Sequence, residues 1–422
     1  MKQRGTKAIL GICLGIVILF TGCGAEPEVT IPLIVPEKIV ISDKEQGVAE
    51  KQQKQQEQQG DTQQQGDESQ RGEAQQQGDS ESGSEPTHTA VSPLPPEISI
   101  TISATGDVTM GNHREQGYEL SFNETYDKAE DKGYFFENVA DIFKADDMTI
   151  VNLEGVLTIS ENYAADRTYN IKGLPEYAYL LRDGYIEAVS MANNHRQDYG
   201  AEGTQDTVDA LESAGIAYAY DKNLGMYETQ GIKIGWVSVN ETSQGVYVEK
   251  ILEEGIRQLR EDGADLVLAC CHWGIEREYY PEDYQKELGK KCIDWGADLV
   301  LGHHPHVLQG IEQYQGKYIV YSLGNFCCGA NRNPSDKDTM IFQQTFTFRQ
   351  EETAQEDSEW NLMEDTEARI IPCRISSVAS RNDFKPTPLT GEEGQQVIDR
   401  VNEYSKEFGV IADADGLLKK AQ

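Results

Sequence analysis

The stretch from Gly263 to His304 begins GADLVLACCHW, ends GADLVLGHH, and carries DYQKELGKKCIDWG between these two near-repeats. Each repeat is an apolar run of strand length, and the segment between them has the apolar spacing of an amphipathic helix. Strand, helix and strand in this order are typical of a βαβ unit, in which the two strands run parallel. No fixed period continues along the chain, so the pair indicates successive βα units and not a solenoid.

The same alternation extends outward from this unit. Strand patterns precede it at residues 98–108, 148–155 and 185–195, and helical patterns at 203–215 and 248–263. After His306 the pattern changes to hairpins, with a turn at Gln315-Gly316, strands at 339–350 and 367–379, and a closing helix at 391–409. We therefore expect an α/β fold with a largely parallel sheet and an additional antiparallel β layer.

The N-terminal part of the chain has a different composition. MKQRGTK is basic, AILGICLGIVILF is apolar and TGC follows, so residues 1–23 are predicted to be a lipoprotein signal peptide, with Cys23 lipidated. The alternative is an uncleaved signal-anchor helix, and both alternatives tether the chain at the extracytoplasmic face of the cell membrane. Residues 24–96, rich in Gln, Glu, Ser and Gly, are predicted to be a disordered spacer. The folded domain is expected at 97–350, with 351–422 as its C-terminal β/helix extension.

The net charge is −35, from 72 acidic and 37 basic residues. A basic face is what nucleic-acid binding requires, so the charge argues against a nucleic-acid partner. An anionic ligand remains compatible with this chain if a metal or a local group of basic residues reverses the field at one place.

Six cysteines follow Cys13 and Cys23, and they include the adjacent pairs Cys270-Cys271 and Cys327-Cys328. No CxxC spacing indicates a thiolate zinc site. Outside the cytoplasm an even number of cysteines favours disulfides, whereas their place at the ends of apolar strands favours buried free thiols. The sequence leaves both alternatives open.

Polar side chains that suit a metal follow the ends of five predicted strands. In parallel sheets ligands bind beyond the carboxyl ends of the strands, so we expect these side chains to converge on one crevice. Carboxylate, amide and imidazole ligands together predict a divalent metal, Mn, Zn, Fe or Mg. The residues are Asp107, Glu154, Asn193, Asn194, His195, His272, His303, His304 and His306.

Other polar residues near these strand ends have alternative interpretations. Glu276, four residues after His272, is predicted to be a general base or an acid that orients His272, or else a surface residue of a loop. Lys172, Arg277, Asn193 and Asn325 are candidates for holding an anionic ligand, although each taken singly is equally compatible with a solvated charge or a turn former.

Six motifs in order, GDVTMG, NLEG, ANNHRQDYG, HWGIEREY, GHHPHVLQ and YSLGNF, resemble the CapA family of capsule and poly-γ-glutamate biosynthesis proteins. The resemblance covers about residues 98–350. That family is similar to calcineurin-like metallophosphoesterases, which implies a metallophosphatase-like layered α/β sandwich. It also implies the following roles: metal ligands at Asp107, Glu154, Asn194, His272, His304 and His306, a proton donor at His195, and no ligand at His303.

The chain departs from the phosphoesterase pattern at two ligand positions. The Asp-x-His motif has Thr109 where the histidine stands, and the bridging carboxylate is Glu154 in place of an aspartate. Near the first motif the CapA family commonly has an arginine, and this chain has Asn112-His113-Arg114 there. One metal, two metals, or a binding pocket derived from a metal site are all compatible with these departures.

The resemblance implies a role in the synthesis, export or anchoring of poly-γ-glutamate or a related capsular polymer, alongside membrane polymer synthase subunits. Two alternatives stand beside it. The first is a metal-dependent hydrolase of an envelope phosphoester or γ-glutamyl amide, favoured by Asn194-His195. The second is a non-catalytic polymer-binding module, favoured by Thr109 in the place of a ligand.

Overall fold

The computed structural model describes residues 96–350, 360–364 and 367–421. The predicted signal peptide, the spacer up to residue 95, Cys23 and residues 351–359, 365–366 and 422 of the predicted C-terminal extension lie outside the described residues, so the fold does not test these predictions. None of the helices in the described ranges has both the length and the apolar character needed to cross a membrane.

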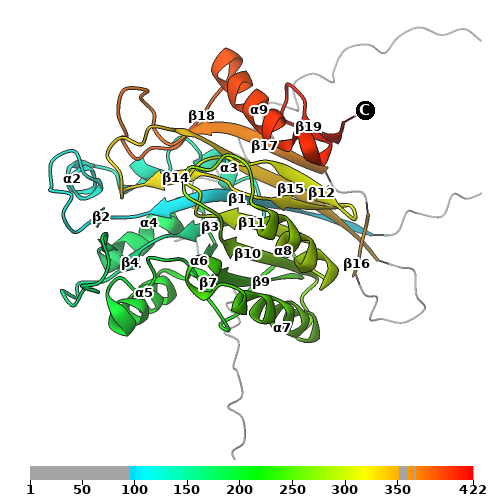
Figure 1. Ribbon diagram of the computed structural model, residues 1–422, viewed down its shortest axis with the longest axis horizontal. Helices are drawn as coiled ribbons and strands as arrows, with labels where there is room; N and C mark the ends of the chain where they lie inside the picture. Colours follow the sequence, from blue (N-terminus) through cyan, green and yellow to red (C-terminus); the bar gives the residue numbers. More distant parts are fainter. Residues whose placement is uncertain (1–95, 351–359, 365–366, 422) are drawn as a thin grey trace, which may run out of the picture. The chain divides into compact units, whose positions relative to one another are not determined.

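Two mixed sheets form the centre of the described unit (Figure 1). The first has the order β18-β17-β15-β1-β3-β6-β7, with β14 beside β1 and β16 beside β15. Its strands are β1 Glu97–Thr109, β3 Met148–Leu153, β6 Ala188–Ser190, β7 Ala217–Ala219, β14 Asn325–Cys328, β15 Asp338–Gln350, β16 Trp360–Leu362, β17 Glu367–Arg374 and β18 Thr387–Pro388. The second has the order β12-β13-β11-β10-β9-β8, with β8 Gly225–Thr229, β9 Ile232–Asn240, β10 Leu266–His272, β11 Leu299–His303, β12 Ile311–Tyr314 and β13 Lys317–Val320.

Helices and small strands surround these sheets. The α-helices are α2 Phe122–Lys128, α3 Ala140–Phe143, α4 Ala178–Asp183, α5 Gly200–Ala214, α6 Glu241–Gln244, α7 Tyr247–Glu261, α8 Asp283–Asp294 and α9 Gly391–Ser405. The 3₁₀ turns are η1 Lys132–Phe135, η2 Pro175–Tyr177 and η3 Lys406–Phe408. The small sheets contain β2 Asn112–His113, β4 Val156–Leu157 and β5 Ile171–Gly173, and β19 Val410–Ala412 and β20 Leu418–Lys420.

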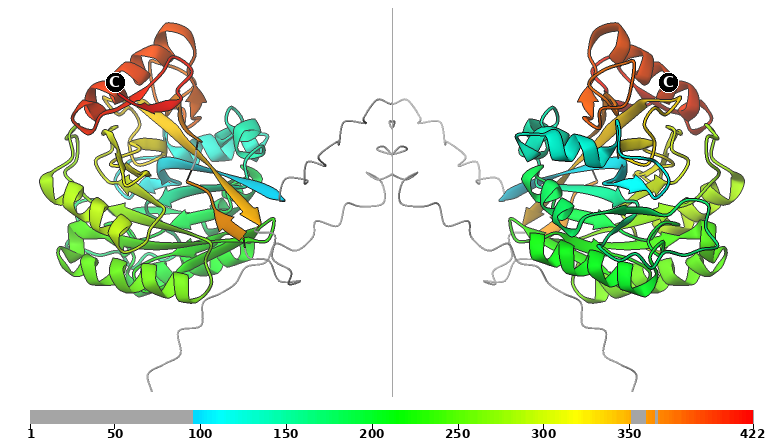
Figure 2. Two further views of the ribbon diagram at one scale, coloured as in Figure 1. Left: turned by 90° about the vertical axis from the view of Figure 1, so that its right-hand side faces the viewer. Right: turned by 90° about the vertical axis from the view of Figure 1, so that its left-hand side faces the viewer.

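The core lies between the two sheets, because alternate residues of each strand point to the same face. Ile100, Ile102 and Ile150 of the first sheet share one buried cluster with Trp236 and Leu268 of the second. The other face of the first sheet packs against α2–α5, and α7 and α8 cover the second sheet. Figures 1 and 2 show α9 on the opposite side of this unit from α5 and α7.

The predicted α/β class with parallel and antiparallel strands is confirmed. The distribution of the strands is a finding that the alternation did not predict. After β7 the chain forms the β8–β9 hairpin, which begins a second sheet, so the parallel strands are divided between two sheets. The predicted turn at Gln315-Gly316 is also confirmed, since both residues have positive φ, at 50° and 81°.

All six cysteines of the folded part are buried and free in the described structure. The alternative of buried thiols therefore fits, and the alternative of disulfides among these six does not. Burial raises the pKa of the Cys270 thiol to about 12, which keeps it protonated and unreactive.

A bulge in β1 positions Asp107. From Glu97 to Ala104 the strand pairs with β15, and at Asp107 it pairs with Asn325 of β14 on one side and Asn152 of β3 on the other. A Cβ at Gly106 would lie 2.0 Å from the carbonyl oxygen of Gly324, so only glycine permits this approach. The bulge therefore ends the antiparallel pairing and directs the next residue to the carboxyl end of the sheet.

At the opposite end of the same strands, Glu187 is expected to make stability depend on pH. Burial raises the pKa of this half-buried acid to about 8, and the nearby charge of Asp146 adds to the effect. Because the folded pKa exceeds the unfolded one, this contribution is complete below about pH 4.5 and is lost as the pH rises through 8. Glu187→Gln keeps an acceptor for the Thr149 amide, which donates to Glu187 Oε2 at 2.8 Å.

We expect Glu187→Gln to stabilise the protein by about 1–2 kcal/mol at pH 9 and by much less at pH 5. Thermal unfolding at both pH values measures the difference, with exposed Glu253→Gln on α7 as the control. An equal effect of Glu187→Gln at pH 5 and pH 9 would contradict this interpretation.

Candidate metal centre

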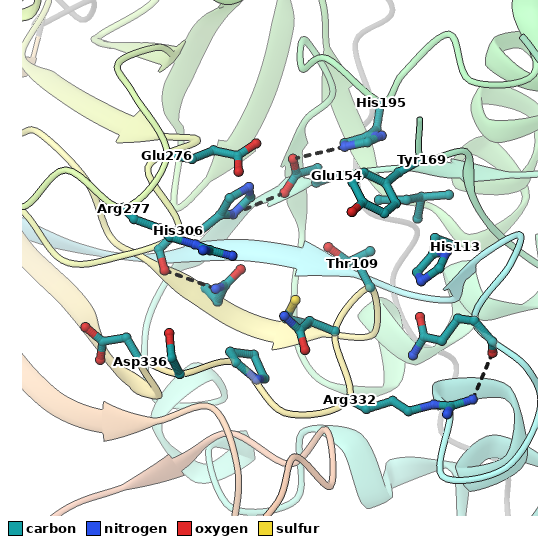
Figure 3. Close-up of a pocket in the computed structure, with 18 of the residues that line it drawn as sticks. Thr109, His113, Glu154, Tyr169, His195, Glu276, Arg277, His306, Arg332 and Asp336 are labelled. Atoms are coloured by element: carbon teal, nitrogen blue, oxygen red, sulfur yellow. Dashed lines mark hydrogen bonds and ion pairs between the residues drawn. The ribbon is translucent and has the colours of Figure 1, made fainter. Parts of the chain in front are cut away.

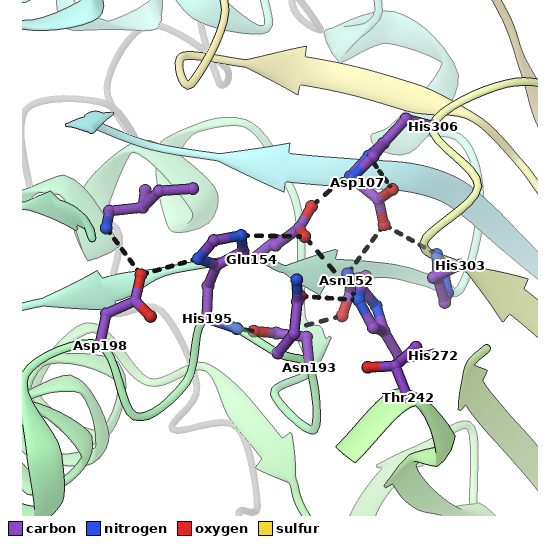
Figure 4. A network of polar contacts seen from close by, with 12 residues as sticks. Asp107, Asn152, Glu154, Asn193, His195, Asp198, Thr242, His272, His303 and His306 are labelled. Carbon is purple, nitrogen blue, oxygen red and sulfur yellow. Dashed lines mark hydrogen bonds and ion pairs between the residues drawn. The ribbon is translucent and has the colours of Figure 1, made fainter. Parts of the chain in front are cut away.

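The candidate residues meet where the carboxyl ends of both sheets come together (Figure 4). The first sheet supplies Asp107 from β1, Glu154 just after β3, and His195 from the loop after β6. The second supplies His272, the last residue of β10, and the loop after β11 that carries His304 and His306. The predicted convergence therefore occurs, although it requires two sheets facing each other and not one continuous sheet.

Glu154, His304 and His306 form a group that can hold a metal ion. One ligand atom of each side chain lies within 4.8 Å of the other two. Glu154 Oε1 and His304 Nδ1 are buried without a hydrogen-bond partner in the described structure, and His306 Nδ1 is buried with the Asp107 carboxylate 3.0 Å away. Buried polar atoms without partners are costly, and a cation removes that cost because it accepts a carboxylate oxygen and imidazole nitrogens together. The residues present thus fit a divalent metal.

The electrostatics of this group also fit a cation. Burial raises the pKa of Glu154, an effect that the charge of His306 opposes only in part. Burial and the neighbouring His306 lower the pKa of His304 to about 4, so its ring is neutral and offers a lone pair. An ion between them would replace these unfavourable contacts with coordination.

Asp107 lies beside this group as an ionised acid. It is fully buried, Asn152 Nδ2 donates to its Oδ1 at 2.8 Å, and His306 Nδ1 lies 3.0 Å from its Oδ2. Burial alone would raise its pKa, but His303 and His306 together outweigh burial and hold the pKa well below its usual range. His303, for which no ligand role is predicted, contacts Asp107 from the other side, with Nδ1 3.5 Å from Oδ1.

His272 and Asn194 adjoin the same group. His272 Nε2 donates to Asn194 Oδ1 at 2.9 Å and lies 3.8 Å from Glu154 Oε1. Burial holds the pKa of His272 well below its usual value, so its ring is neutral. The structure therefore brings all six predicted metal ligands into one cluster, while only Glu154, His304 and His306, among the described residues, converge closely enough to share an ion without movement.

His195 is held by a chain of polar contacts. Its Nδ1 donates to Asp198 Oδ2 at 2.7 Å, and Arg167 Nη1 pairs with Asp198 Oδ1 at 3.1 Å. The other ring nitrogen, Nε2, lies 4.0 Å from Glu154 Oε1. Burial would lower the pKa of His195, but Asp198 and Glu154 outweigh burial and raise it. The sequence places Asp198 close behind His195 at the same strand end but assigns it no role, and its spacing of three positions from His195 is the signal that could have done so.

A pocket of about 740 Å³ opens from the cluster (Figure 3). Glu154, His195 and His306 line one part of it, together with the predicted residues Glu276, Arg277 and Asn325. Glu276 and Arg277 are exposed at its rim, and Asn325 Nδ2 donates to the carbonyl oxygen of His306 at 3.0 Å.

Two predicted ligand-binding residues lie elsewhere. Asn193 is buried, its Nδ2 donates to the carbonyl oxygens of Leu153 and Met191, and its Oδ1 accepts from the His195 amide. Lys172 donates to the carbonyl oxygen of Ser160 and pairs with Glu161 at 2.7 Å. Neither side chain lines the pocket, and Asn193 instead fixes the backbone that carries His195.

The loop with the histidines is strained. His304 and His306 have φ of 95° and 58°, and Arg277, whose amide donates to the Pro305 carbonyl oxygen at 2.8 Å, has φ of 67°. Non-glycine residues in this region cost free energy, and they persist where the surrounding packing holds them. The strained backbone of this loop directs the imidazoles of His304 and His306, two positions apart, toward the same metal-binding group.

Comparisons with known proteins agree with the motifs. The model of the bacterial capsule synthesis protein family PGA_cap matches residues 101–330. The PGA biosynthesis protein CapA of Bacillus subtilis (strain 168) is 31% identical over 247 residues, which cover 54% of this chain and 63% of that protein. The capsule biosynthesis protein CapA of Bacillus anthracis is 28% identical over 252 residues, covering 54% and 59%. The matches thus span less than two thirds of these relatives' length.

Among solved structures, this chain is similar to a hypothetical protein from Thermus thermophilus. The two share 17% sequence identity with a TM-score of 0.34, over 69% of this chain and 98% of the other.

Proposed function

Because the chain belongs to the bacterial capsule synthesis protein family PGA_cap, we propose that it takes part in the synthesis, export or anchoring of poly-γ-glutamate or a related anionic capsular polymer. The observation that carries the proposal is the pocket of about 740 Å³ with a metal-binding group in its wall. That volume exceeds what a metal ion and its waters need, so it admits a segment of a polymer.

The proposal includes a location and partners. The basic and apolar N-terminus and Cys23 support a lipid anchor at the extracytoplasmic face of the cell membrane. An anchored domain on a long spacer reaches a polymer as it leaves membrane synthase subunits, which we propose as its protein partners. The net charge of −35 makes a local cation necessary for an anionic polymer to approach.

Glu154, His304 and His306 are the residues that would hold a divalent cation, with Asp107, His272 and Asn194 beside them. Such a cation supplies Lewis-acid chemistry, which polarises a carbonyl or phosphoryl oxygen. Around it this chain's own residues exclude water, since Asp107 and His272 are fully buried, and they hold the ligand atoms in fixed positions.

A second candidate function is hydrolysis of an amide or phosphoester in the polymer. The observation that favours it is the His195–Asp198–Arg167 chain, which fixes the His195 ring so that Nε2 faces the pocket beside Glu154. A proton held at Nε2 is placed for transfer to a leaving group. Glu276 at the rim is an exposed carboxylate that would accept a proton from water.

We expect the purified full chain to bind poly-γ-glutamate more tightly with Mn²⁺ or Zn²⁺ than after chelation, and His304→Ala to weaken that binding at least about tenfold. Isothermal titration calorimetry measures the affinity, and gel filtration of the same mixtures detects shortened polymer. Shortening that Asp198→Asn abolishes would support the hydrolase. Metal binding with no polymer binding under any condition would contradict the proposed function.

A further inference from the structure

Two arginines of the pocket differ from most arginines of this chain. Nine of the arginines in the described ranges lie within 4.0 Å of a carboxylate, as expected for so acidic a protein. Within those ranges Arg277, Arg332, Arg369 and Arg381 have no such ion pair, and the first two line the pocket. They are its only Lys or Arg lining residues among those described.

Arg332 is held in place by the backbone around it. Its Nη2 donates to the carbonyl oxygens of Gln116 and Gly117 at 2.9 and 2.7 Å. The loop that carries it is fixed by Asn382, whose side-chain amide donates to the carbonyl oxygens of Cys328 and Asn331. A guanidinium fixed in this way loses little conformational entropy when it binds a ligand.

The remaining donors of Arg332 have no partner among the described residues. Its Nε is buried without a hydrogen bond, and no hydrogen bond is formed by its Nη1. The charge of Arg332 acts on His113 and on Glu124, and Glu115 is another lining residue of the pocket, but none of these forms an ion pair with it among the described residues. The guanidinium therefore carries a positive charge that no carboxylate of the described chain neutralises by direct contact.

Arg277 and Arg332 occupy different sides of the pocket. Figure 3 shows Arg277 beside His306, whereas Arg332 lies beyond Thr109 and below His113. The metal-binding group thus has a cationic position on its own side and a second one further along the pocket. A small single anion would need only the first of these positions, while a chain with repeating acidic groups would use both.

We propose that Arg332 binds one carboxylate of the polymer at a subsite separate from the metal-binding group, so that the pocket selects a chain of repeating carboxylates. The inference rests on the proposed function and specifies its ligand. A singly charged carboxylate matches one free guanidinium, whereas a phosphomonoester, with up to two charges, would be repelled more strongly by Glu115 and Glu276 of the same pocket. A phosphodiester also carries a single charge, so the test includes it as a separate probe.

The test uses the purified full chain and three probes: a short γ-linked glutamate oligomer, the same oligomer with its carboxylates converted to carboxamides, and a glycerol-phosphate oligomer. Arg332→Gln is expected to weaken binding of the acidic oligomer about tenfold or more, and to make it less dependent on salt. It should leave binding of the carboxamide oligomer unchanged. Arg332→Lys should bind with intermediate affinity, and Arg381→Gln, which removes an exposed arginine outside the pocket, should bind like the wild type.

Gly117→Ala provides a variant that keeps the charge. A Cβ there would lie 3.2 Å from Arg332 Nη2, and φ of 36° at Gly117 strains an alanine backbone. The change should therefore shift both the guanidinium and the Gly117 carbonyl oxygen that accepts from it, and weaken binding of the acidic oligomer without changing net charge. Melting temperatures identify any variant that is merely unfolded.

The outcomes separate this inference from the proposed function. If Arg332→Gln lost affinity for the acidic and the carboxamide oligomers equally, Arg332 would have a structural role and the inference would be overturned. Unchanged affinity of Arg332→Gln for the acidic oligomer would overturn the inference alone. If the wild type bound the glycerol-phosphate oligomer more tightly than the acidic glutamate oligomer, and Arg332→Gln lost that binding, the ligand of Arg332 would be a phosphate and not a carboxylate. A wild-type chain that takes up metal but no oligomer would overturn both proposals.

Discussion

Replacing Glu154 by glutamine is expected to lower the affinity of the chain for Mn²⁺ or Zn²⁺ by at least about 100-fold, since changes to residues that only support a ligand already cost about 10- to 100-fold. Glu154 is the one carboxylate of the group that it forms with His304 and His306. Its Oε1 is buried and has no hydrogen-bond partner in the described structure. Glutamine keeps the shape of the side chain and removes the charge that attracts the ion.

In the metal-free protein the same substitution should not lower the stability. A buried carboxylate without a partner is unfavourable, so Glu154→Gln should unfold at the same temperature as the wild type or at a higher one when metal is absent. Added metal at about 100 times its dissociation constant stabilises the wild type by about 2.7 kcal/mol, and that gain should disappear in the variant.

Metal content after dialysis and thermal unfolding with and without metal provide the two measurements. Glu287→Gln on α8 is the matched control, because that glutamate is exposed and has no ion pair among the described residues. Equal metal content in Glu154→Gln and the wild type would remove Glu154 from the ligand set.

Gly302→Ala is expected to destabilise the protein by about 3 kcal/mol, the upper end of the usual cost of overpacking. Gly302 lies in β11, just before the histidines. A Cβ at this position would be 2.0 Å from the Tyr321 carbonyl oxygen and 2.6 Å from Trp273 Nε1. It would therefore separate these two groups, which share a hydrogen bond of 2.9 Å.

The same change should weaken metal binding, because the displaced strand carries His304 and His306. Denaturant unfolding measures the stability, and calorimetry measures the metal affinity. Gly133→Ala is a suitable control, since the nearest atom to its new Cβ is the side-chain oxygen of exposed Asp131, at 3.2 Å. If Gly302→Ala lost no more stability than Gly133→Ala, the backbone of β11 would have to relax around the added methyl group.

The sequence predicts the members of the site better than their arrangement. Asp107, Glu154 and His272 could be found because each ends a strand, and the carboxyl ends of parallel strands are where ligands bind. The division into two sheets could not be found, because βα alternation is the same whether a new strand joins the old sheet or begins another. The pairing of β1 with β15 likewise depends on contacts between residues such as Thr101 and Thr345, 244 positions apart.

Two predicted ligand-binding residues do not line the pocket because nearby acceptors take their hydrogen-bond donors. Asn193 is adjacent to Asn194 in the sequence, but the carbonyl oxygens of Leu153 and Met191 take its amide donors. In the same way, Lys172 Nζ donates to the carbonyl oxygen of Ser160 and pairs with the Glu161 carboxylate. Arg332 shows the reverse, since it stands in an irregular loop with no periodic pattern, and only the folded chain reveals that it lines the pocket without a carboxylate partner among the described residues.

The pairing of β1 with β15 also sets the order in which the chain can mature. Residues 97–104 are synthesised early, yet their partners are residues 342–349, near the end of the domain. Contacts so distant in sequence slow folding, because a long loop must close before they form. Strand β1 can complete its antiparallel pairing only after residue 349 has been synthesised. All three residues of the metal-binding group, the last of which is His306, therefore precede the segment that completes the pairing of the strand carrying Asp107.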